Sequence, residues 1–213
     1  MESILHAIDF ILHPDLAYLL QQYGVYIYVI LFLIIFVETG LVVMPFLPGD
    51  SLLFTAGMLT VVEPGLNIYV LIPLLLVAAV SGDTLNYFVG KYFSDRVLKW
   101  KYKNQPLVKK EWIDETHNFF EKHGNKTIVL ARFVPIVRTI APFVAGIGKM
   151  TYTTFTSYNI IGAFIWIVSM VLLGHFLGSY QFVKDNLEKF VLGIVFLSVL
   201  PMVFKFVQSK MKK

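Results

Sequence analysis

Long apolar stretches fill most of the chain, and three of them suit uninterrupted helices. A helix needs roughly 20 consecutive apolar residues to cross a bilayer. Residues 66–90 reach that length with one acid inside, Asp83, and residues 153–178 carry no charge. Residues 188–207 form a third candidate, interrupted near its end by Pro201. The pattern therefore predicts three transmembrane helices and an all-α integral membrane protein.

Two further apolar stretches are broken by prolines, glycines and charged residues. Proline inside a helix removes a hydrogen bond and clashes with the preceding turn. Non-helical backbone at membrane depth persists only inside protein or beside a watery cavity. We therefore expect two re-entrant or broken helical hairpins. The interruptions are Glu38, Thr39, Gly40, Pro45, Pro48, Gly49 and Asp50 in residues 17–62, and Arg132, Pro135, Arg138 and Pro142 in residues 126–150.

The order of these elements predicts an inverted repeat within a single membrane domain, residues 1–213. A broken segment and a span make up residues 17–90, and the same order recurs in residues 126–180. Residues 91–125 link the two halves, and the helix at 188–207 follows them. Gly/Pro-interrupted segments at matching places in two halves are typical of transport sites near the bilayer midplane. The repeat rests on topology, since the halves share little residue identity.

The linker contains one helical pattern, over residues 109–123. Gly124 follows as a plausible helix end. We expect an amphipathic helix on the cytoplasmic membrane surface; a helix packed on the protein's own core explains the pattern equally well. The apolar side is formed by Trp112, Ile113, Thr116, Phe119 and Phe120.

Composition and charge placement support this class. The 213 residues are 57% apolar and 15% charged, against about 45–50% and about 25% in soluble domains. No Lys or Arg precedes Lys91, and cations then gather in residues 91–126 and at the C-terminus. Cation-rich short loops stay cytoplasmic, so we place both regions inside and expect no nucleic-acid partner. The chain has no cysteine, hence no thiol nucleophile, and we expect no cofactor and no metal.

Five charged residues stand out because they lie away from the ends of the apolar stretches: Glu38, Asp50, Asp83, Arg132 and Arg138. Each intramembrane charge costs at least about 2.5–3.5 kcal/mol, which makes it a functional candidate. One interpretation is architectural, with acids and arginines neutralising each other. Buried pairs contribute little net stability, because desolvation offsets the Coulomb gain. This favours a role beyond holding the fold.

The second interpretation is a phosphate site. Arginine presents a planar fork that suits phosphate oxygens. Arg132 and Arg138 would lie well apart around a straight helix, but a break at Pro135 could let them converge on one anion. Glu38 and Asp50 could release the anion or carry a coupling proton, since burial favours the protonated carboxyl. Asp83 is a further coupling candidate, although a helix-to-helix hydrogen-bonding role suits it slightly better.

Together these motifs resemble the DedA family, within the wider group of VTT-domain proteins, over nearly the whole chain. The resemblance implies a multi-pass bacterial inner-membrane protein that flips a phosphate-bearing lipid, most of all undecaprenyl phosphate, with dependence on protons or sodium ions. The family's essential acids fall on Glu38 and Asp50, and its essential arginines on Arg132 and Arg138. Assembly as a homo-oligomer stays open. The motifs are Glu38-Thr39-Gly40, Pro45 to Asp50, Ser81-Gly82-Asp83 with Asn86, Tyr87 and Gly90, and Arg132 to Arg138.

Other functions are weaker alternatives. A phosphatidylethanolamine flippase or scramblase would use the same arginines plus an acid for the ammonium. A proton- or sodium-coupled antiporter for small solutes would use the acids alone. A scaffold for division or secretion machinery would need neither. An intramembrane aspartyl protease needs Gly-x-Gly-Asp, which neither Gly49-Asp50 nor Gly82-Asp83 provides. We therefore expect a transporter and not an enzyme.

Overall fold

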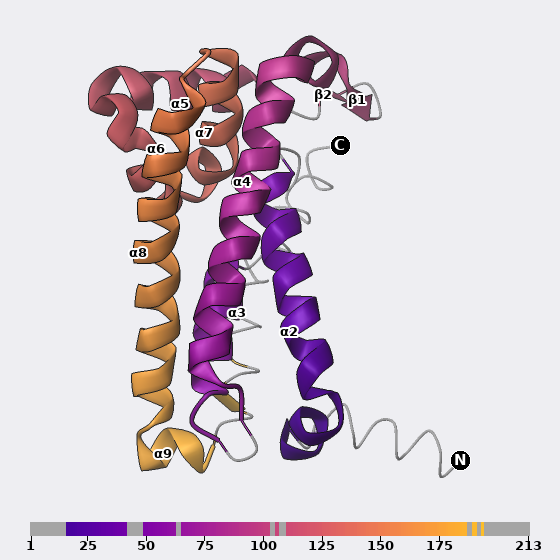
Figure 1. Cartoon of the computed structure of the whole chain (residues 1–213), viewed down its shortest axis with the longest axis vertical. Coiled ribbons are helices and arrows are strands. Elements are labelled where there is room, and N and C mark those ends of the chain that lie inside the picture. Colours follow the sequence, from indigo (N-terminus) through magenta and orange to yellow (C-terminus); the bar gives the residue numbers. More distant parts are fainter. Residues whose placement is uncertain are drawn as a thin grey trace, which may run out of the picture. The chain divides into compact units, whose positions relative to one another are not determined.

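The computed structural model describes residues 16–41, 49–62, 65–102, 105–106, 110–186, 189–190 and 193, which are almost entirely helical (Figure 1). The helices are α2 (Leu16–Gly40), α3 (Gly49–Met58), α4 (Ile68–Lys99), α5 (Lys110–His123), α6 (Thr127–Leu130), α7 (Pro135–Ile147), α8 (Tyr152–Gly178) and α9 (Gln181–Lys184), with 3-10 turns η1 (Gly124–Lys126) and η2 (Ala131–Phe133). Two short strands, β1 (Lys101–Tyr102) and β2 (Gln105–Pro106), pair antiparallel.

The chain forms two compact units. The first is drawn from Met1–Leu31, Pro48–Ile72 and Ser169–Lys213, and the second from Phe32–Leu47 and Pro73–Val168. In the first unit α3 and α8 approach closely, because Gly57 lies against the Val171 carbonyl and Gly174 against that of Phe54.

Two helices in the described part of the chain are long and apolar enough to cross a membrane. They include Ile68–Ser94 of α4 and Tyr152–Gly178 of α8, each 27 residues. Large apolar side chains such as Val77 and Phe164 are more than half exposed on them, as expected for helices that face hydrocarbon. The predicted helices at 66–90 and 153–178 are confirmed, although α4 continues to Lys99. The predicted helix at 188–207 lies almost wholly outside the described residues.

The first interrupted stretch differs from the prediction at Glu38 and Thr39. Helix α2 runs through both and ends at Gly40, and α3 then begins at Gly49. Glutamate and threonine keep their backbone N–H groups, so neither forces a helix to stop. Residues 42–48, with the predicted breaks at Pro45 and Pro48, lie outside the described residues.

The second interrupted stretch has its break at Val134. This residue is extended, with φ −117° and ψ 106°, between η2 and α7, and Pro135 is the first residue of α7. The residue before a proline disfavours helical backbone, which explains the break. The expected interruptions at Arg138 and Pro142 are wrong, because α7 is continuous through both. A proline removes only one bond from the ladder, and packed membrane helices tolerate it.

Helix α5 lies against α7 in the second unit (Figure 1). It begins at Lys110 and ends before Gly124, whose φ of +58° suits glycine. Its Trp112, Ile113 and Phe120 side chains pack on a buried cluster of Val97, Ile140, Phe143 and Val144. A helix thus forms over nearly the predicted residues, and these three side chains contact the protein's own core.

Glycines allow α4 and α7 to approach each other at two points. Gly90 of α4 lies against the Phe143 carbonyl, and Gly146 of α7 lies against the Tyr87 carbonyl. A side chain at either position would overlap the facing backbone. This reciprocal contact fixes α7, and with it Arg138, against α4.

Candidate functional site

Four of the five predicted intramembrane charges are buried together in the second unit. The end of α2 supplies Glu38, α4 supplies Asp83, η2 supplies Arg132 and α7 supplies Arg138. The unit therefore gathers two acids and two arginines from four separate elements.

The first ion pair joins α7 to the end of α2. Arg138 Nη2 donates a hydrogen bond to Glu38 Oε1 at 2.7 Å, linking residues 100 positions apart. Both side chains are buried, with 6% and 1% of their surface exposed. Such a charge-assisted bond in an apolar interior is strong, so it ties the end of α2 to α7.

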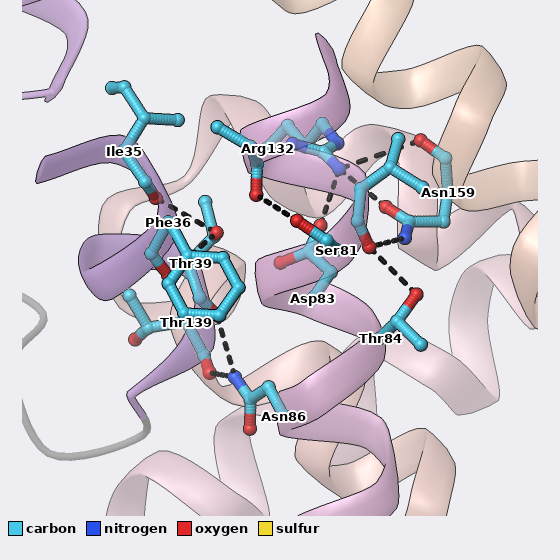
Figure 2. Close-up of polar contacts among 12 residues, drawn as sticks. Ile35, Phe36, Thr39, Ser81, Asp83, Thr84, Asn86, Arg132, Thr139 and Asn159 are labelled. Atoms are coloured by element: carbon cyan, nitrogen blue, oxygen red, sulfur yellow. Dashed lines mark hydrogen bonds and ion pairs between the residues drawn. The ribbon is translucent and has the colours of Figure 1, made fainter. Parts of the chain in front are cut away.

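The second ion pair is part of a small network (Figure 2). Arg132 Nη2 donates to the Asp83 carboxylate and also to Asn159 Oδ1 of α8. The Arg132 stem lies beside Gly162, where an added Cβ would come within 3.0 Å of Nε. Arg132 Nε and Nη1 are buried and have no hydrogen-bond partner among the described residues. Part of the guanidinium fork thus keeps its capacity to donate.

Both arginines lie at one buried indole, that of Trp166 on α8. Arg138 Cζ is 5.0 Å from the ring centroid and Arg132 Cζ is 5.6 Å from it. These distances suit cation–π attraction, which is stronger away from water. The extended backbone at Val134 separates the two arginines into different elements, so both can reach the same side chain. Trp166 thus lies close to both cationic groups.

A buried amide connects the elements that carry the first ion pair. Asn86 of α4 donates from Nδ2 to the Thr39 carbonyl at 3.1 Å and to the Thr139 carbonyl at 2.8 Å (Figure 2). Thr39 follows Glu38 and Thr139 follows Arg138 in the sequence. Asn86 therefore holds the backbone on both sides of this pair.

The remaining predicted site residues lie elsewhere or have a local role. Asp50 lies in the first unit as the second residue of α3, directly after Gly49. Gly40 ends α2, where an added Cβ would be 3.5 Å from the Gly82 Cα. Among the described residues, no group of three His, Asp or Glu side chains could hold a metal ion.

Sequence reasoning missed Asn159 and Trp166 and placed Asn86 only beside the site. Asn159 had a signal, because a buried amide in a charge-free span needs a partner. Trp166 had none, because aromatic residues are common in membrane helices.

The chain is similar in sequence to several membrane proteins. The sequence matches the VTT domain over residues 47–176. It is 50% identical to protein DedA of Escherichia coli (strain K12) over 213 residues, covering 99% of this chain and 96% of that protein. It is 45% identical to an uncharacterized membrane protein of Mycobacterium leprae over 168 residues, 79% of this chain and 74% of that one. Inner membrane protein YqjA of Escherichia coli (strain K12) is 30% identical over 179 residues, with 84% and 80% covered. No solved structure matches the chain.

The apolar helices and the matched domain define an integral membrane protein built on a VTT domain. Because the identity to DedA extends over almost the whole chain, the protein belongs to the DedA family.

Proposed function

We propose that this protein moves a phosphate-bearing lipid across the bacterial inner membrane, with Arg132 and Arg138 binding the phosphate. The observation that carries the proposal is the presence of two buried guanidinium groups at one indole, inside a unit built on membrane helices. Burying two ion pairs costs desolvation free energy, and apolar packing often holds helices together equally well.

The chemistry of the cluster suits a phosphate. Arg132 retains two buried nitrogens that can donate hydrogen bonds, and guanidinium forks bind phosphate oxygens in pairs. An arriving phosphate competes with the Asp83 and Glu38 carboxylates for the same cations. The acids in turn displace the phosphate when it leaves. The two ion pairs are neutral together, so the charge of the phosphate is balanced only when the displaced carboxylates take up protons or other cations.

The competition between phosphate and carboxylates for the arginines also allows lipid movement to be coupled to cation uptake. A proton or a sodium ion on Glu38 or Asp83 weakens that acid's attraction for its arginine, which favours phosphate binding. Asp50, in the first unit, is a further acid proposed for coupling. Cation uptake and lipid movement are then linked thermodynamically.

The proposed lipid is undecaprenyl phosphate, whose head group is a single phosphate on a long apolar chain. Two arginines match the head, and the chain remains in the bilayer. A phosphatidylethanolamine would also place its ammonium beside an acid, which Glu38 or Asp83 could supply. The experiment therefore compares the rates at which the two lipids cross the bilayer.

We propose that the segments that contain α3 and α7 re-enter the membrane and form the two halves of an inverted repeat. Helix α3 has 10 residues and α7 has 13. At about 1.5 Å per residue they extend about 15 and 20 Å, which is less than the roughly 30 Å hydrocarbon core. Helix α5 and the C-terminus lie on the cytoplasmic side in this arrangement, by the placement of cations.

The test is to reconstitute the purified protein in liposomes that contain undecaprenyl phosphate, and to time the appearance of the head group on the opposite face. The wild-type protein should accelerate this movement. The rate is measured both with and without a pH gradient across the membrane. Arg138→Lys should slow it at least about tenfold, since a point charge replaces a fork. Acceleration of phosphatidylethanolamine alone would reassign the lipid. Solute exchange in vesicles without lipid phosphate would replace the proposal with an antiporter.

A further inference from the structure

An apolar groove of about 470 Å³ lies on the surface of the second unit between α4 and α8. Its walls include Val77 and Val80 on α4 and Ile160 and Phe164 on α8. Val77, Ile160 and Phe164 are 61%, 50% and 54% exposed. These positions belong to the two helices of membrane length, so the groove faces hydrocarbon.

The groove has three hydroxyl-bearing residues, of which Tyr152 is one and the other two, Ser81 and Thr84, are bonded within α4. Ser81 Oγ donates to the Val77 carbonyl at 2.5 Å, and Thr84 Oγ1 donates to the Val80 carbonyl at 2.7 Å. These two hydroxyl donors are thus satisfied within their own helix. Because buried or lipid-facing donors without a partner are costly, this arrangement suits an apolar chain and disfavours a water-soluble solute.

One side chain, Asn159, bonds both to the groove wall and to the arginine cluster. The Val80 carbonyl accepts a hydrogen bond from Asn159 Nδ2 at 3.2 Å. Asn159 Oδ1 in turn accepts from Arg132, and Figure 2 shows Thr84, Asn159 and Arg132 in this succession. The Arg132 stem lies directly behind α8 at Gly162. The Val80 carbonyl in the groove wall and the Arg132 guanidinium are therefore joined by two hydrogen bonds through Asn159.

We propose that this groove binds the hydrocarbon chain of the transported lipid while the phosphate is held at Arg132. The proposal rests on the proposed function and adds a binding site for the chain. A volume of about 470 Å³ falls in the range of roughly 300–1,000 Å³ typical of small-ligand sites. The chain stays on the lipid face of α4 and α8, and only the head group enters the protein.

Two adjacent residues of α8 provide a matched pair for the test. Ile160 lines the groove, whereas Ile161 does not, and their exposed fractions are 50% and 52%. We would place the photocrosslinker benzoylphenylalanine at position 160 or 161 of the full chain. The protein would be reconstituted in phosphatidylcholine liposomes with radiolabelled undecaprenyl phosphate. Labelling should be on the order of tenfold greater at 160 and should fall with excess unlabelled undecaprenyl phosphate.

A second measurement uses the same pair in transport. Ile160→Trp fills the groove and should slow head-group movement on the order of tenfold, whereas Ile161→Trp should leave it unchanged. Equal labelling at 160 and 161, or equal rates in the two tryptophan variants, overturns the chain site even though the wild type transports. A wild type that moves no lipid phosphate overturns the proposed function as well, so the two failures are distinguishable.

Discussion

At the residue scale, the two ion pairs hold their arginines differently. Arg138 pairs with Glu38 across a gap of 100 positions in the sequence. Arg132 pairs with Asp83 and also with the Asn159 amide, and keeps two nitrogens without a partner in the described chain. A phosphate can therefore accept hydrogen bonds from these two Arg132 nitrogens. Arg138 instead precedes Thr139, whose backbone carbonyl accepts a hydrogen bond from Asn86.

The Glu38–Arg138 pair predicts a distinct pattern of stability. Arg138→Gln removes the cation and leaves a buried carboxylate, so the free energy of unfolding should fall by about 3–5 kcal/mol. The double variant Glu38→Gln/Arg138→Gln removes both charges and should recover most of that loss. Thermal unfolding in detergent checks both variants. A double variant as unstable as the single one would contradict the account of this pair.

Asn86 predicts a second stability effect. Asn86→Leu keeps a branched side chain but removes the hydrogen bonds to the Thr39 and Thr139 carbonyls, at about 0.5–1.5 kcal/mol for each bond lost. Ser157→Ala is the control, because the exposed Ser157 hydroxyl bonds only within its own helix. The melting temperature in detergent should fall for the first variant and stay unchanged for the second. Equal melting temperatures would show that Asn86 does not fix these elements.

The sequence revealed the charged residues of the cluster, because a charge within an apolar stretch is conspicuous. It did not reveal which acid pairs with which arginine, since both pairs join elements far apart along the chain. Trp166 resembles an ordinary residue of a membrane helix, and the partners of Asn159 and Trp166 depend on what α8 packs against.

At the element scale, the close contact of α4 with α7 depends on glycine. Gly90→Ala or Gly146→Ala should force the helices apart and lower the free energy of unfolding by about 1–3 kcal/mol. Gly24→Ala in α2 is the control, because an added Cβ there has no neighbour within 4 Å. That substitution should be neutral or stabilise by up to about 1 kcal/mol. Thermal unfolding of the three variants checks the comparison, and a Gly90→Ala protein as stable as Gly24→Ala would contradict it.

Element positions followed from the sequence where a pattern was long and regular. Helices α5 and α8 lie close to the predicted ranges and α4 extends past its predicted end, and each has at least three turns of consistent pattern. The breaks were less predictable. Val134 is extended because Pro135 follows it, but Pro142 stays within α7 because packing outweighs one missing hydrogen bond.

At the scale of the whole molecule, the proposed topology places α5 on the cytoplasmic side and the α3–α4 connection outside. The chain contains no cysteine, so single cysteines can be introduced without altering the background. Tyr69→Cys, at a position 86% exposed at the start of α4, should react with an impermeant maleimide in intact cells. Lys122→Cys, at an exposed position of α5, should react only after the cells are opened. The reverse labelling pattern would invert the topology.

The central claim is that the buried arginines bind the lipid phosphate and do not serve only to hold the fold. The measurement that tests it most directly is the rate at which undecaprenyl phosphate crosses liposomes containing the Glu38→Gln/Arg138→Gln protein. We predict a protein that is folded and inserted but moves the head group no faster than empty liposomes do. Movement at the wild-type rate would mean that the ion pair is purely architectural, and it would contradict the account.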